Sequence, residues 1–283
     1  MGTIGLYRHA DVYDALHLPG TRAEVRTLQR LARRFGAMPA AGSHRAAVWL
    51  EPACGTARHL RIAAARGARV IGIDTSREML DFARARLREA SLIRRAKIVQ
   101  GDIARVGDLV PSASVDVAFV LINSIRHLAT DRTMLDHLRG MTRVLRAGGI
   151  YAVGLSLSAY GFEQESEDVW SARHGSARVT QVVQYIPPTL GSRRERVISH
   201  VSCSTRAGRV VFEDVSTYWL RTYSLDQWRR LVDLAGLSVL GVVDQDGVGT
   251  TPAEPGYAVW ILGVKPKSQE RAMRPPTRRS HPR

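Results

Sequence analysis

The fold of this 283-residue chain is decided by the stretch WLEPACGTAR, residues 49–58, followed by VIGID, residues 70–74. An apolar run enters Glu51 and a turn of small residues, after which helical periodicity begins. The second apolar run ends in Asp74, nineteen residues beyond Gly55. That spacing is close to the roughly 20 residues that separate a phosphate-binding turn from a ribose-binding acid. The pattern predicts a β-loop-α-β unit.

The small residues of the turn, among them Ala53 and Gly55, allow the backbone to approach a ligand closely. Asp74 has the chemistry to accept hydrogen bonds from two neighbouring hydroxyl groups. The turn does not read G-x-G-x-x-G, which disfavours a nicotinamide cofactor. The alternative, an ordinary tight turn between a strand and a helix, also favours glycine because the chain must take positive φ.

The turn instead resembles motif I of the class I S-adenosylmethionine-dependent methyltransferases, usually written (D/E)-x-(G/A)-x-G-(T/S)-G. Three further segments follow in the order of that family: KIVQGDI at 97–103, SVDVAFVLINS at 114–124, and HLRGMTRVLRAGG at 137–149 before a strand. The resemblance covers residues 46–155. It implies an α/β, Rossmann-like fold with a seven-stranded, mostly parallel sheet, helices on both faces, and an antiparallel β insertion.

The resemblance also implies S-adenosylmethionine as the cofactor and assigns its binding residues. The turn from Glu51 to Thr56 is expected to face the methionine part, Asp74 the ribose hydroxyls, and Asp102 with Ile103 the adenine. The other expected cofactor contacts are Tyr13, Ala53, Gly55, Thr75, Met79, Gly101, Leu121 and Asn123.

A narrower branch is indicated by the β insertion after the fifth strand, which resembles the aminosugar N,N-dimethyltransferases and glycine N-methyltransferases. Tyr13-Asp14 matches a Tyr-Asp dipeptide whose ring helps to close the cofactor site in that branch. NSIRHL at 123–128 is similar to the pattern S-S-I-G-H-L, with Arg126 where glycine is usual. YSLDQW at 223–228 resembles the closing helix. The departure at Arg126 leaves the local shape of the pocket open.

The expected function is therefore methyl transfer to a small-molecule acceptor, preferably an amine nitrogen. His127 follows the fourth strand and is the candidate general base or orienting partner of the acceptor; the alternative is that it packs or caps the next helix. Enzymes that methylate nucleobase amino groups typically carry the pattern (D/N/S)-P-P-(Y/F/W) at this position. No proline or aromatic residue follows Asn123, which disfavours that class. Small-molecule O-methylation, methylation of RNA or another polyanion, and non-catalytic cofactor binding remain the alternatives.

The chain is expected to have five parts. They are a helical cap at 1–45, the cofactor-binding core at 46–158, an antiparallel insertion that roofs the substrate at 159–218, the rest of the core sheet at 219–264, and a basic disordered tail at 265–283.

The net charge of +15 raises nucleic acid as a partner. However, seven basic residues and one acid lie in the segment 265–283, and arginines elsewhere are spread over helix faces, so this partner is the less favoured one. Cys54 and Cys203 have no metal-ligand spacing, so no metal is expected. No apolar run is long enough to span a bilayer, and no signal segment is evident, which predicts a cytoplasmic protein without a membrane partner. A homo-oligomer is left open.

Overall fold

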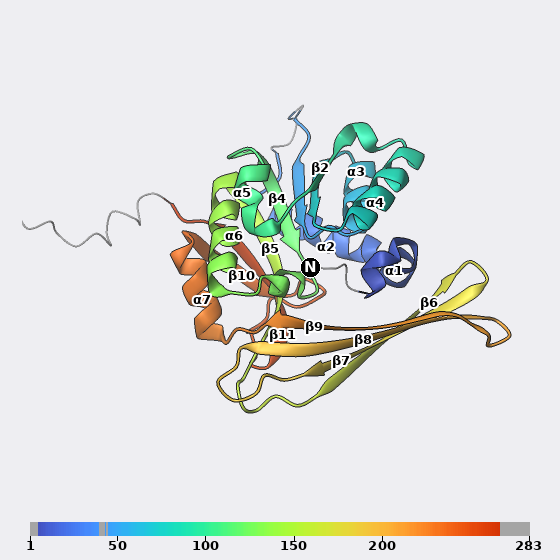
Figure 1. Ribbon diagram of the computed structural model, residues 1–283. Helices are drawn as coiled ribbons and strands as arrows, with labels where there is room; N and C mark the ends of the chain where they lie inside the picture. Colours follow the sequence, from blue (N-terminus) through green and yellow to red (C-terminus); the bar gives the residue numbers. More distant parts are fainter. Residues whose placement is uncertain (1–4, 40–42, 44, 267–283) are drawn as a thin grey trace, which may run out of the picture.

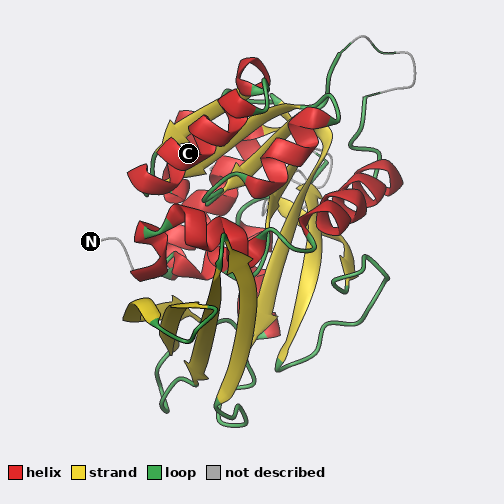
Figure 2. Ribbon diagram, turned by 90° about the vertical axis from the view of Figure 1, so that its right-hand side faces the viewer, coloured by secondary structure: helices red, strands yellow, loops and turns green. Residues whose placement is uncertain are grey.

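The computed structural model describes residues 5–39, 43 and 45–266, and it contains two β-sheets (Figures 1 and 2). The predicted seven-stranded sheet is confirmed, with strand order β10-β11-β5-β4-β1-β2-β3. Its strands are β1 (Val48–Pro52), β2 (Arg69–Asp74), β3 (Ala96–Gln100), β4 (Val115–Val120), β5 (Leu145–Leu157), β10 (Leu237–Val243) and β11 (Gly256–Val264).

Strands β1 to β5 pair in parallel, whereas β11 pairs antiparallel with β5, and β10 antiparallel with β11. Every residue of β4 is buried, as expected for a central strand covered on both faces. The strand order reverses between β1 and β4, because the chain passes from β3 at one edge back to the middle of the sheet. Ligands of open α/β sheets bind at the carboxyl ends of the strands at such a reversal.

Helices cover both faces of the sheet, as predicted (Figure 1). One face packs against the hydrophobic sides of α6 and α7, and the opposite face against those of α2, α3 and α4. The helices are α1 (Ala10–His17), α2 (Thr21–Arg34), α3 (Arg58–Ala65), α4 (Arg77–Glu89), α5 (Val106–Leu109), α6 (Asp131–Val144) and α7 (Leu225–Leu234), with short 3₁₀ turns η1 (Gly5–Arg8), η2 (Ile93–Arg95), η3 (Ile103–Arg105) and η4 (Ser124–His127).

The second sheet is antiparallel throughout, in the order β6-β7-β8-β9 (Figure 2). Alternation in the sequence predicted three of its strands, and the structure adds a fourth. Their bounds are β6 (Ser166–His174), β7 (Ala177–Ile186), β8 (Arg194–Thr205) and β9 (Val210–Arg221). The inward side chains of β7 and β8 pack against Leu6 of η1 and Val12 and Leu16 of α1. The N-terminal segment therefore lies between the two sheets.

Two local features depart from the sequence pattern. Helical periodicity continues to the glycines at 148 and 149, yet α6 ends at Val144 and β5 begins at Leu145. Thr75 and Glu78 have the spacing of a capping box, yet Ser76 is the N-cap of α4 and its hydroxyl accepts the N–H of Met79. The predicted tail lies outside the described residues from residue 267 on. Among the described residues, no helix is both long and apolar enough to cross a membrane.

Candidate active site

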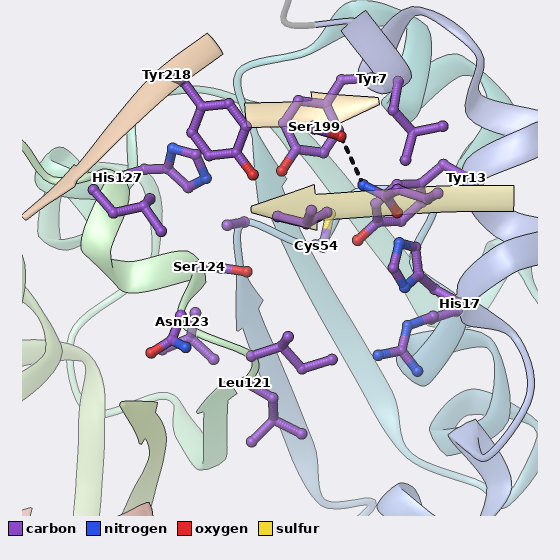
Figure 3. A pocket seen from close by; sticks show the side chains of 18 of the residues that line it. Tyr7, Tyr13, His17, Cys54, Leu121, Asn123, Ser124, His127, Ser199 and Tyr218 are labelled. Atoms are coloured by element: carbon purple, nitrogen blue, oxygen red, sulfur yellow. Dashed lines mark hydrogen bonds between the residues drawn. The ribbon is translucent and has the colours of Figure 1, made fainter. Parts of the chain in front are cut away.

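A cavity lies between the two sheets, at the carboxyl ends of β1 and β4 (Figure 3). Its wall on the side of the large sheet comes from the turn after β1 and the turn after β4. Residues of η1 and α1 form one flank, and the inward side chains of β7, β8 and β9 form the opposite wall. The cavity therefore occupies the position at which the strand order reverses.

The turn after β1 takes its shape from three left-handed residues at alternate positions. Ala53, Gly55 and Ala57 have φ of 57°, 50° and 56°. Asp74 fixes this turn to the next strand, because its Oδ2 accepts the N–H of Gly55 at 2.8 Å while its Oδ1 accepts the N–H of Ser76 at 2.9 Å. Burial raises the pKa of Asp74. The carboxylate thus stands beside the turn, where the sequence placed it.

Glu51 belongs to a buried chain of charged groups that the sequence analysis missed. The Nδ1 of His59 lies 2.7 Å from Glu51 Oε1, and its Nε2 lies 2.8 Å from Glu24 Oε2. Burial alone would lower the pKa of His59, but the Glu51 carboxylate and the hydrogen bonds with both glutamates outweigh it and raise that pKa. Arg58 also donates to Glu24, at 2.5 Å.

One carboxylate oxygen in this group of charged residues has no partner among the described residues. Glu51 lines the cavity and is 6 % exposed, and its Oε2 has no hydrogen-bond partner within the described part of the chain. A buried carboxylate oxygen is normally paired, because its desolvation is costly. The residues present therefore fit a ligand that brings a cationic or N–H donor to this end of the cavity, as the amino group of S-adenosylmethionine would.

Tyr13 lines the cavity, whereas Asp14 holds helix α1 to neighbouring elements. Tyr13 lines the cavity, and a Cβ placed on Gly55 would lie 3.5 Å from its ring, so the ring covers the turn. Asp14 is 5 % exposed and accepts the Thr56 hydroxyl at 2.7 Å and the Arg61 guanidinium at 2.6 Å. Asp14 therefore ties α1 to the turn and to α3, and the Thr56 hydroxyl serves this contact.

Asn123 follows β4 in a left-handed conformation, with φ of 60°. Its side-chain amide donates to Ser156 Oγ at 2.9 Å and accepts the N–H of Ser156 at 2.7 Å. Asn123 thus lines the cavity while both ends of its amide clamp the turn to β5. The neighbouring Ser124 hydroxyl faces the cavity and has no hydrogen-bond partner among the described residues (Figure 3).

His127 presents its ring to the cavity from η4. The ring stacks on Tyr218 at a centroid distance of 5.4 Å, and Tyr7 meets it edge-on at 6.4 Å. Burial first, and then the charge of Arg126, lower the pKa of His127 to about 4. At neutral pH the imidazole is therefore uncharged and able to accept a hydrogen bond.

Arg126, the departure from the pattern S-S-I-G-H-L, points away from the cavity and is 3 % exposed. Its Nε donates to the carbonyl of Arg221 at 2.9 Å, and its Nη2 lies 2.8 Å from Glu195 Oε2. Both partners belong to strands of the second sheet. The arginine therefore links the turn that carries His127 to the second sheet, and its side chain does not occupy the pocket.

The predicted cofactor residues fall into two groups. The structure brings Tyr13, Glu51, Ala53, Leu121 and Asn123 to the cavity, together with His127. Those outside its lining are Gly55, Thr56, Asp74, Thr75, Met79, Gly101, Asp102 and Ile103. Asp74 and Thr75 follow β2, and Gly101–Ile103 follow β3, so both groups lie along the same carboxyl edge of the sheet.

The turn after β3 is held from beneath by His137, a buried residue of α6. Its Nδ1 lies 2.7 Å from the carbonyl of Ile103, and its Nε2 lies 2.8 Å from the Tyr151 hydroxyl. Burial lowers the pKa of His137 to about 4, so the ring is neutral, donates to the carbonyl and accepts from the tyrosine. This contact fixes the segment that the sequence assigned to the adenine.

Cavity residues missed from sequence lie mainly on the second sheet and in η1. Tyr7, Trp170, Gln181, Tyr185, Ser199 and Tyr218 belong to this group. The alternation of their strands was visible, but the face turned toward the cavity was not. Among the described residues, no group of His, Cys, Asp and Glu is placed to hold a metal ion.

Comparison with known proteins finds a family match for part of the chain. Residues 50–149 match a family of methyltransferase domains. No curated protein matches the chain in sequence.

Solved structures with the same fold span almost the whole chain. The sugar N-methyltransferase KedS8 from Streptoalloteichus is 18% identical with a TM-score of 0.69, and the match covers 94% of this chain and 95% of that one. DesVI from Streptomyces venezuelae is 21% identical with a TM-score of 0.68, covering 91% and 98%. The amino pentose methyltransferase CalS10 from Micromonospora echinaspora is 21% identical with a TM-score of 0.61, covering 84% and 91%. Residues 50–149 therefore match a methyltransferase domain, and the chain as a whole has the class I methyltransferase fold.

Proposed function

We propose that this protein transfers the methyl group of S-adenosylmethionine to the nitrogen of a small, uncharged amine held between the two sheets. The division of the cavity carries the proposal. Among the described lining residues, Glu51 and Arg58 are charged and His59 pairs with Glu51, and all three lie on β1 or at the start of α3. The wall formed by β7, β8 and β9 bears only aromatic, aliphatic, hydroxyl and amide groups.

The charged end suits the cofactor. We assign Glu51, with its unpaired Oε2, to the amino group of the methionine part, Asp74 to the ribose hydroxyls, and the turn from Asp102 to Ile103 to the adenine. S-adenosylmethionine supplies a methyl group that is already activated on a sulfonium. The protein therefore has to hold the nucleophile in line with that methyl and exclude water. Tyr13, which covers the turn after β1, serves the exclusion of water.

The uncharged end suits a neutral amine better than a hydroxyl acceptor. A hydroxyl nucleophile needs a base of substantial strength, whereas an amine in its free-base form already has the attacking lone pair. With a pKa lowered to about 4, His127 is a weak base, and it acts here as a neutral acceptor that orients an N–H of the substrate. Among the residues that the structure describes, none with a cationic side chain lines that end to bind a carboxylate or phosphate.

Two structurally similar proteins support nitrogen as the acceptor atom. KedS8 is a sugar N-methyltransferase and CalS10 an amino pentose methyltransferase. A nucleic acid is disfavoured, because the second sheet covers the site. A small-molecule acceptor therefore fits the site best.

The first test is cofactor binding by calorimetry. Asp74→Ala is expected to weaken binding of S-adenosylmethionine by about 1–3 kcal/mol, because hydrogen bonds to a charged group are lost. Asp81→Ala is the matched control, since Asp81 is an exposed carboxylate on α4 that pairs with Arg84. Equal affinities for both variants would contradict the assignment of Asp74.

The second test is methyl transfer from labelled S-adenosylmethionine to a panel of amines, phenols and RNA. We expect label in neutral amines and none in RNA. Label in phenols alone would replace N-methylation by O-methylation. Cofactor binding without transfer to any member of a broad panel would favour a non-catalytic binding protein.

A further inference from the structure

One inward position of the second sheet breaks the apolar pattern of its strand. Val179 and Val183 point inward from β7 and are fully or almost fully buried, yet Gln181 between them is an amide. Ser199 on β8 is likewise buried, between Val197 and Val201. Positions at which a polar residue interrupts a buried pattern are expected at functional sites.

Gln181 lines the cavity, is 7 % exposed, and uses only part of its hydrogen-bonding capacity. Its Nε2 donates to Ser199 Oγ at 3.0 Å (Figure 3 draws this bond as a dashed line). Its Oε1 has no partner among the described residues. Because the Ser199 hydroxyl both donates and accepts, turning the amide over would leave the nitrogen unpaired instead. In either orientation one polar atom of Gln181 is unsatisfied in the ligand-free protein.

The side chains that line the cavity on the same wall as this amide are mainly aromatic and uncharged. Trp170, Tyr185 and Tyr218 line the same wall, and rings of this kind pack against the face of a cyclic ligand. A ligand pocket is typically apolar or aromatic, with a few polar groups that set orientation and specificity. Gln181 and Ser199 are placed to be such a group.

We propose that Gln181 recognises a hydroxyl or amide group of an uncharged, cyclic amine acceptor, at a position on the ring other than the reacting nitrogen. This inference rests on the proposed N-methyltransferase function. Gln181 is a specificity-determining residue, and the acceptor satisfies the amide atom that the free protein leaves unpaired.

The chain offers a matched control on the same strand. Gln184 points to the opposite face of β7, is exposed, and donates to Glu167 at 3.2 Å. Gln181→Met and Gln184→Met remove the same amide and keep a similar side-chain volume. They differ in whether the amide faces the cavity.

The activity arm uses labelled S-adenosylmethionine with cyclohexylamine and the 2-, 3- and 4-isomers of aminocyclohexanol. Because alkyl amines are protonated at neutral pH, kcat/KM is expressed per concentration of the uncharged free base. For wild type and Gln184→Met we expect kcat/KM for at least one aminocyclohexanol to exceed that for cyclohexylamine by about tenfold. In Gln181→Met this ratio should fall to about one, because kcat/KM for the aminocyclohexanol falls while that for cyclohexylamine stays the same. Equal ratios in wild type and Gln181→Met would overturn the inference.

The stability arm does not need an acceptor. A double variant, Gln181→Met with Ser199→Ala, removes the whole polar pair, so the free protein should melt at or above the wild-type temperature. A melting temperature several degrees lower would show that the amide serves packing, and would overturn the inference. Absence of methyl transfer by the wild type would instead contradict the proposed function, while this arm still decides the role of Gln181.

Discussion

Replacing His59 by leucine tests the hydrogen-bonded chain Glu24-His59-Glu51 at the charged end of the cavity. The ring is 3 % exposed and pairs with Glu51 on one side and Glu24 on the other. Leucine is of similar size but offers no donor to either carboxylate. Glu51, with one oxygen already unpaired, would then lose its remaining side-chain partner.

The expected cost is about 3–5 kcal/mol of unfolding free energy, the range for removing one partner of a buried ion pair. His174→Leu is the control, because His174 pairs with Asp11 at 3.0 Å with side chains 37% and 54% exposed. An exposed pair of this kind contributes about 0–1 kcal/mol. The difference between the two variants therefore isolates the effect of burial.

The cost should depend on pH. Burial alone would raise the pKa of Glu24, but the hydrogen bond from His59 and the charge of Arg58 outweigh it and lower it to about 2. A lowered carboxyl pKa contributes stability that is present above the unfolded value, about 4.5, and is lost as pH falls toward 2. The raised pKa of His59 contributes stability present below about 6.5 and lost as pH rises through the folded value.

Urea denaturation at a series of pH values measures both effects. The gap between wild type and His59→Leu should be largest between about pH 4.5 and 6.5 and should narrow toward pH 2. If His59→Leu and His174→Leu cost the same, or if the gap is constant with pH, the chain Glu24-His59-Glu51 does not stabilise the fold as an ion-paired unit.

Two further predictions concern the cap and the reaction. Asp14→Ala should lower the free energy of unfolding by about 1.5–3 kcal/mol, because the hydrogen bonds from Thr56 and Arg61 are lost. The same variant should weaken S-adenosylmethionine binding measured by calorimetry, and unchanged affinity would show that α1 does not support the turn. His127→Asn should lower kcat by about tenfold with cofactor affinity unchanged, because the hydrogen bond that orients the substrate is lost; near-normal turnover with a lower melting temperature would make His127 structural. Because its pKa is lowered to about 4, wild-type kcat should show no limb from His127 between about pH 6 and 8, and a limb that disappears in the variant would refute its neutral state.

The sequence determined the features that depend on neighbours along the chain. The turn at 51–57 needs small residues at left-handed positions, and Asp74 must follow the next strand, so both are visible as a local pattern. The apolar run of β4 is typical of a strand buried on both faces, and the helical periodicity that begins after the turn corresponds to α3. The order of these segments matches the class I methyltransferases, and that resemblance implied the seven-stranded sheet.

Helix and strand boundaries near 145 were decided by tertiary contacts. The glycines at 148 and 149 resemble a helix stop, yet β5 already begins at Leu145, because that residue pairs with Val115 of β4. A Cβ on Gly149 would lie 2.9 Å from the carbonyl oxygen of Val115, so this glycine is needed for close approach of the strands. A pattern read along the chain contains no information on such a neighbour.

The acceptor end of the site was likewise decided only by the tertiary structure. Alternation along β7 shows that Gln181 shares a face with Val179, but either face could have been turned to solvent. Asn123 was expected to contact the cofactor; it lines the cavity, and both ends of its amide pair with Ser156, thirty-three residues away. Hydrogen-bonding capacity is a property of the residue, whereas the partner that uses it is set by which distant strands pack together.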